Sequence, residues 1–140
     1  MRTEKLFSRS IQSLPDIFDF ANQFLAEQQV DKTASFGLLL AVEEIFTNCV
    51  KYNHSTADIL LAFEQTENRI IITIKDYDVE GFDMSKPPSV DTDEPLEKRK
   101  VGGLGLFLVQ KLMDHVDYQY ENRISTITLV KTIGENTCSM

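Results

Sequence analysis

Glu44 and Asn48 are two polar side chains that could do chemistry together, because four positions separate them in the segment AVEEIFTNCVKYNH. On a helix, this spacing places both side chains on one face. A carboxylate can accept a proton or orient a hydroxyl group. A neutral amide oxygen can ligate a hard cation such as Mg²⁺. Lys51 continues the face one turn later and is a candidate ligand contact, although the same spacing is also common on a solvated helix face.

Asp76 is a second candidate, because it ends the apolar segment RIIITIKD and is followed by Asp78 and Gly81. A carboxylate at the end of a strand can accept a hydrogen bond from an exocyclic amine such as that of adenine. Gly81 would let a ligand ring lie close to the backbone. A simple turn uses the same residue types, so both interpretations stay open at this point.

Gly102, Gly103 and Gly105 lie within four positions, directly before an apolar pattern at helical spacing. That pattern is formed by Leu104, Phe107, Leu108, Leu112 and Val116. Glycines at the start of a helix allow an anion to approach the backbone, and a helix N-terminus favours phosphate. A flexible hinge would explain the glycines equally well. The segment is neither a P-loop nor a Rossmann fingerprint, since no Gly-Lys-Ser/Thr and no βαβ unit accompany it.

Length and composition limit the possible classes of protein. The 140 residues predict one domain, residues 1–140, and the net charge of −8 argues against nonspecific nucleic-acid binding. The N-terminus lacks the continuous apolar region of a signal peptide, which favours a cytoplasmic location. Cys49 and Cys138 lack a metal-binding spacing, and Cys49 is expected to be a small core residue.

The elements that must position these groups follow from periodicity. We expect an edge strand at 5–11, a helix at 14–29 and a second helix from Asp31 to about Tyr52. Residues 59–65 and 69–76 predict one hairpin, and residues 116–122 and 125–131 predict another. Between them lies an irregular segment, 77–103, and such long loops are usually functional or disordered. Separate runs of helices and strands indicate an α+β two-layer sandwich.

Taken together and in this order, the motifs resemble a known family. Glu44-x-x-x-Asn48, Asp76 at a strand end and Gly102-Gly-Leu-Gly105 resemble the ATP-binding domain shared by gyrase, heat-shock chaperone, histidine-kinase and mismatch-repair ATPases. The segments EEIFTN and PLEKRKVGGLGLFLVQKLMDHVDY are most similar to those of anti-sigma-factor serine kinases. The resemblance implies a mixed, mostly antiparallel sheet covered on one face by helices.

The resemblance also implies roles for individual residues. Glu44 would be the general base, Asn48 would bind Mg²⁺, and Asp76 would read the adenine amine. The other candidate cofactor-binding residues are Lys51, Asp78, Gly81, Lys100, Gly102, Gly103, Leu104, Gly105 and Leu106. Residues 84–101 would form a lid over the phosphates, with Lys98, Arg99 or Lys100 near them. The family's first glycine box usually reads Asp-x-Gly, whereas Asp78 stands at the position of that glycine.

The function that the resemblance implies is that of a regulatory serine/threonine protein kinase. Such a protein would bind ATP and Mg²⁺, phosphorylate an anti-sigma-factor antagonist, sequester a sigma factor and form a homodimer. Asp78 favours an alternative, a nucleotide-binding or degenerate protein-interaction module without kinase activity, because an aspartate adds a Cβ and a negative charge near the polyphosphate. A self-contained ATPase is a third interpretation.

Overall fold

The computed structural model describes residues 2–53, 55–79 and 108–133, and these form two helices, a short 3₁₀ helix and five strands. In chain order they are β1 (Arg2–Phe7), η1 (Ile11–Ser13), α1 (Leu14–Glu27), α2 (Lys32–Tyr52), β2 (Ile59–Thr66), β3 (Arg69–Tyr77), β4 (His115–Glu121) and β5 (Ile124–Thr132). Residues 108–112, before β4, are also helical.

Local residues and hydrogen bonds determine where the two long helices begin and where α1 ends. Pro15 lies in the first turn of α1, where its missing N–H costs nothing. After α1, Gln29 adopts a left-handed conformation (φ 58°), and the N–H of Val30 bonds back to the carbonyl of Leu25 at 3.0 Å. The Asp31 carboxylate then caps α2 by accepting from the N–H of Ala34 at 2.7 Å.

All five strands form one sheet in the order β1-β2-β3-β5-β4, and its four pairings are antiparallel. Two-residue turns join β2 to β3 and β4 to β5. Asn122 and Arg123, which form the second of these turns, both have positive φ, as tight hairpin turns prefer. The predicted hairpins and the mostly antiparallel sheet are confirmed.

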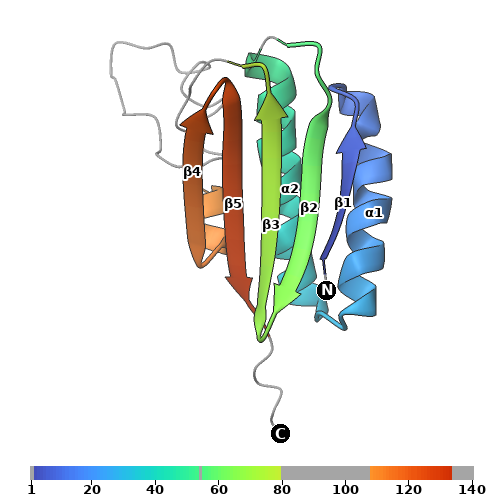
Figure 1. Cartoon of the computed structure of the whole chain (residues 1–140). Coiled ribbons are helices and arrows are strands. Elements are labelled where there is room, and N and C mark those ends of the chain that lie inside the picture. The colour runs from blue at the N-terminus through green and yellow to red at the C-terminus, as the bar shows by residue number, and fades with distance from the viewer. Residues whose placement is uncertain (1, 54, 80–107, 134–140) are drawn as a thin grey trace, which may run out of the picture.

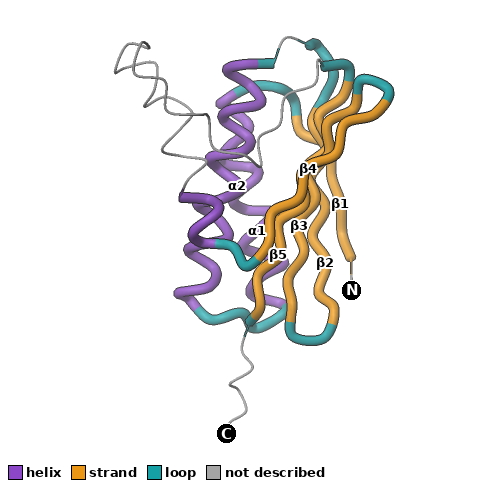
Figure 2. The backbone as a smooth tube through the Cα atoms, turned by 90° about the vertical axis from the view of Figure 1, so that its left-hand side faces the viewer, coloured by secondary structure: helices purple, strands orange, loops and turns teal. Residues whose placement is uncertain are grey.

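The helices cover one face of the sheet, so that the domain has two layers (Figures 1 and 2). The buried stripe predicted for α2 is confirmed, since Leu38, Ala41, Val42, Ile45 and Cys49 are at most 1% exposed. On the α1 side, Phe20 makes edge contacts with Phe7 of β1 and Phe63 of β2, with ring centroids 5.7 and 5.6 Å apart. The α+β two-layer prediction is therefore confirmed.

Helix α2 is also long and apolar enough to span a membrane by length and composition alone. It packs on the sheet through its apolar stripe, as the core helix of a globular domain does. Its hydropathy is thus weak evidence for a membrane span.

Some predicted boundaries were wrong. The edge strand is Arg2–Phe7 and not 5–11, because the Ser10 hydroxyl accepts from the N–H of Gln12 and starts η1 instead of continuing the strand. Helix α1 ends at Glu27 rather than residue 29. Tyr77, expected to begin the loop, is the last residue of β3, and most of the segment 77–103 lies outside the described residues.

Candidate functional site

Glu44 and Asn48 lie on one face of α2, as their spacing predicts. The Nδ2 of Asn48 donates a hydrogen bond to Oε2 of Glu44 at 3.2 Å. Asn48 is 3% exposed, and its amide oxygen has no hydrogen-bond partner among the described residues. An amide oxygen with free lone pairs beside a carboxylate suits a hard cation, so these residues fit a magnesium ion.

Asp76 faces the helices because it continues the buried stripe of β3. Ile70, Ile72 and Ile74 alternate with more exposed neighbours, and Asp76 is the next residue in the same phase. Its partners across the sheet are Ile59 and Ser125. The carboxylate is therefore carried into the interior, where it is 1% exposed and needs polar partners.

Two side chains supply those partners, and we call Arg9, Asn53 and Asp76 the Asp76 cluster. Nη2 of Arg9 donates to Oδ1 of Asp76. Nδ2 of Asn53, at the C-terminal cap of α2, donates to Oδ2 at 2.5 Å. Both carboxylate oxygens are thus engaged, and the Arg9 side chain is itself only 8% exposed.

The rest of the Arg9 guanidinium contacts two backbone carbonyls. Its Nε donates to the carbonyl of Ala57 at 3.2 Å, and its Nη1 donates to the carbonyl of Cys49 at 3.3 Å. The Cys49 carbonyl lies in the last turn of α2, where a positive charge is favourable. Arg9 therefore joins the segment after β1 to α2, to the α2–β2 connection and to β3.

The thiol of Cys49 lies beside the Asp76 cluster. Burial raises the pKa of this thiol well above its usual value, and the Asp76 carboxylate raises the pKa further, while Arg9 lowers it. The thiol consequently stays protonated at neutral pH. Cys49 serves as the small core residue that its position in the sequence indicates.

Asp78 has a different environment. It adopts a left-handed backbone conformation (φ 59°), and its carboxylate accepts from Nε of Arg123 at 2.9 Å. The N–H of Val79 donates to the carbonyl of Arg123 at 3.0 Å, and the hydroxyl of Tyr120 donates to the carbonyl of Val79 at 2.8 Å. The β4–β5 hairpin thus holds the chain where it leaves β3.

The structure brings most of the described candidates to one end of the domain. The C-terminal ends of α2 and β3 and the β4–β5 turn lie together at the top of Figure 1. Asp76 contacts this end of α2 through Asn53, while Lys51, in the last turn, is exposed to solvent. The other candidates lie outside the described residues and stay predictions: Gly81, Lys100, Gly102, Gly103, Leu104, Gly105 and Leu106.

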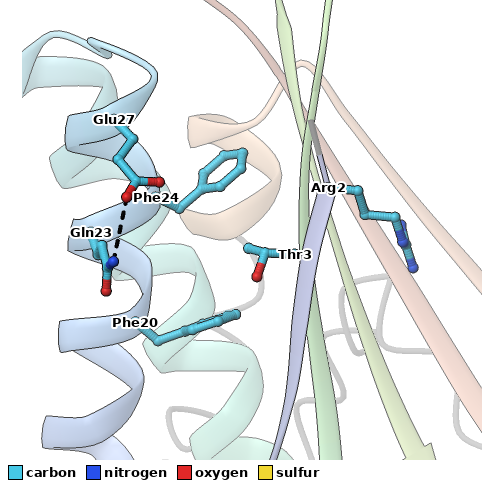
Figure 3. A pocket seen from close by; sticks show the side chains of 6 residues that line it. All are labelled: Arg2, Thr3, Phe20, Gln23, Phe24 and Glu27. Carbon is cyan, nitrogen blue, oxygen red and sulfur yellow. Dashed lines mark hydrogen bonds between the residues drawn. The ribbon is translucent and has the colours of Figure 1, made fainter.

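Two hollows in the described part of the chain lie elsewhere. One, of about 240 Å³, lies between α1 and β1, where Phe20 and Phe24 flank Thr3 (Figure 3). Another of about 240 Å³ lies on the β3–β5–β4 part of the sheet and includes Lys75 and Gln119. Neither contains Glu44, Asn48 or Asp76. Within the described ranges, no group of three or more His, Cys, Asp or Glu residues could hold a metal ion, so a metal there would need oxygens from elsewhere.

Sequence reasoning missed four residues of this region: Arg9, Asn53, Tyr120 and Arg123. Arg9 lies 67 positions before its partner Asp76, and Arg123 lies 45 positions after Asp78. A single arginine in a Ser-Arg-Ser segment has no local partner that would reveal its burial. Asn122-Arg123 indicated a hairpin turn, but nothing in the local sequence indicated that Arg123 contacts Asp78.

A protein-family model matches most of the chain, including the candidate residues described above. Residues 7–131 match the model of the histidine kinase-like ATPase domain. The chain belongs to this family. The match includes β1 from Phe7 onward, both helices and nearly all of β5, and therefore covers every described candidate residue.

Individual relatives agree with this family. The chain is 38% identical over 102 residues to the serine-protein kinase RsbW of Staphylococcus aureus, and the match spans 67% of this chain and 63% of the relative. A crystal structure of the RsbU and RsbW domains of a Mycobacterium tuberculosis protein has a TM-score of 0.70 at 14% identity, covering 95% of this chain and 32% of that one. The SiaB–SiaC complex of Pseudomonas aeruginosa contains a chain with a TM-score of 0.65 at 12% identity, with 94% and 88% covered. The structures show the same fold.

Proposed function

We propose that this protein is an ATP-dependent serine/threonine kinase that phosphorylates an anti-sigma-factor antagonist and acts as an anti-sigma factor. The observation that carries the proposal is the pairing of Glu44 with Asn48 on α2, together with a buried Asp76 that is bound by Asn53 at the C-terminal cap of the same helix. Family membership and the similarity to RsbW support the use of ATP and the kinase class. A cytoplasmic location and a homodimer remain part of the proposal.

Each group would have one task in phosphoryl transfer. Asn48 would hold Mg²⁺ through its free amide oxygen, and Asp76 would accept a hydrogen bond from the adenine amine. The Glu44 carboxylate, oriented by its bond to Asn48, would accept the proton of the incoming serine hydroxyl. When bound, Mg·ATP would supply the phosphoryl group and neutralise its developing charge.

The surroundings of Asp78 favour the kinase over a degenerate binding module. Its backbone adopts the left-handed conformation that a glycine would take without strain, and aspartate tolerates this conformation better than most residues. Its charge is paired with Arg123. The objection that rests on the negative charge is therefore met by Arg123, and the backbone conformation at this position is one that aspartate tolerates.

Replacing Glu44 tests the proposal directly. Glu44→Gln should lower the rate of phosphotransfer from radiolabelled ATP to a cognate antagonist by about 10²-fold or more, because the proton acceptor is lost. Nucleotide affinity, measured by calorimetry with and without Mg²⁺, should change by less than about threefold, since a glutamine retains the shape of the site.

Glu43→Gln is the matched control, since it removes a half-buried carboxylate from the adjacent position of the same helix. It should transfer phosphate at the wild-type rate. A wild-type protein that binds Mg·ATP but phosphorylates no antagonist would support the binding module instead. A wild-type protein that ignores ATP at millimolar concentration would overturn the kinase and the nucleotide-binding module, and would leave the degenerate protein-interaction module.

A further inference from the structure

The Asp76 cluster contains a charged side chain, Arg9, to which the proposed function assigns no role. The Arg9 guanidinium is almost fully buried and donates to the Asp76 carboxylate and to the backbone carbonyls of Ala57 and Cys49. A buried guanidinium with three acceptors from three segments has a fixed position, because its planar fork leaves little freedom once several donors are engaged.

The carboxylate that Arg9 contacts is fixed in turn. An ionised carboxylate offers about four lone-pair sites, and Arg9 and Asn53 each occupy one on different oxygens. The Cys49 thiol also hydrogen-bonds to this carboxylate, so about one lone-pair site remains for a further donor. The guanidinium also supplies the countercharge that an ionised carboxylate needs in the interior. Asp76 is thereby an oriented acceptor with no freedom to turn toward a different donor.

We propose that Arg9 is a positioning residue for base recognition, which aims the ionised Asp76 carboxylate so that the site selects a purine with a 6-amino group. The inference rests on the proposed function, in which Asp76 accepts from the adenine amine. A purine with a 6-oxo group would present an acceptor to the same fixed carboxylate, and two facing acceptors repel each other. Discrimination between these purines therefore depends on how firmly Arg9 holds Asp76.

The test compares the affinities of the whole protein for ATP and for inosine triphosphate, which carries the 6-oxo group. The wild-type protein should prefer ATP by at least about tenfold, the usual effect of a hydrogen bond to a charged group. Arg9→Lys keeps the positive charge but removes the planar guanidinium, whose several donors hold Asp76 and the two carbonyls together. It should reduce the preference to below about threefold, by weakening ATP binding while the affinity for inosine triphosphate stays unchanged.

Arg2→Lys is the matched control, because Arg2 is about half exposed and, in the described part of the chain, forms ion pairs with Glu4 and Glu64, far from the Asp76 cluster in the hydrogen-bond network. It should retain the wild-type preference. Asn53→Ala provides a second variant that leaves the buried ion pair intact, in case Arg9→Lys does not fold. It should lose part of the preference, because the carboxylate is then held through one oxygen only.

The outcomes distinguish a failure of the proposed function from a failure of the positioning role. If the wild-type protein binds neither triphosphate, the proposed function fails and the positioning role fails with it. If the wild-type protein prefers ATP and both folded variants keep that preference, only the positioning role is overturned. An equal loss of both affinities would show a merely structural role. Tighter ATP binding by Arg9→Lys would show that Arg9 competes with the base, which also overturns the inference.

Discussion

The regions around Asp76 and Asp78 differ sharply, although one residue separates these aspartates. The Asp76 side chain is 1% exposed and pairs with an arginine that is 8% exposed, whereas Asp78 is 66% exposed and pairs with an arginine that is 55% exposed. Asp76 is still in phase with the buried stripe of β3, while Asp78 follows the strand and has left the pleat. The position of a carboxylate relative to the strand end thus determines whether its ion pair is buried or solvated.

The largest difference between the two regions should appear in stability. Asp76→Ala should lower the free energy of unfolding by about 3–5 kcal/mol, because it leaves the buried Arg9 without its countercharge. Asp78→Asn is the control, because asparagine tolerates the left-handed backbone, and it should cost no more than about 1 kcal/mol. Urea unfolding followed by circular dichroism measures both, and equal losses would contradict the contrast.

Tyr120 should have an intermediate effect, because it anchors the Asp78 region through one hydrogen bond. Tyr120→Phe removes the hydroxyl that donates to the carbonyl of Val79 and should cost about 0.5–1.5 kcal/mol in unfolding free energy. Tyr52→Phe is the control, since the Tyr52 hydroxyl has no hydrogen bond among the described residues. Identical unfolding midpoints for the two variants would show that the Tyr120 bond contributes nothing.

The smallest effect should belong to the exposed ion pair itself. Asp78→Asn removes the charge and retains a residue that tolerates the left-handed conformation, so it should cost less than about 1 kcal/mol. The difference from wild type should vanish at about 1 M salt, because salt screens exposed charges. Unfolding at low and high salt measures this, and a salt-independent loss would indicate that the pair acts through its geometry.

Local patterns made much of the fold predictable. The apolar spacing of α2 and the β-rich composition of β2, β3 and β5 depend on neighbours in the chain, so the helices and hairpins follow from the sequence. The position of β1 was harder to predict, because alternation in residues 5–11 gave no sign that Ser10 would cap a 3₁₀ helix. Local alternation cannot register a competing side-chain cap.

The candidate site was also predictable only where its residues follow a local pattern. Glu44 and Asn48 could be paired from their spacing, and Asp76 could be identified from its place at a strand end. Arg9 and Arg123 could not be found, because each reaches its aspartate only after the sheet has assembled. Long-range ion pairs have no periodic signal in the sequence, so sequence reasoning found the groups proposed to contact the ligand and missed those that hold them.

The long reach of Arg9 has a consequence for how the domain folds. Its hydrogen bonds close sequence separations of 40, 48 and 67 residues, whereas α2 and the β2–β3 hairpin are local. Contacts of high sequence separation generally form late, because loop closure must come first. The end of the domain that is proposed to bind the base would then mature only when the N-terminal strand docks, and a newly made chain would pair Glu44 with Asn48 on α2 before Arg9 fixes the Asp76 carboxylate.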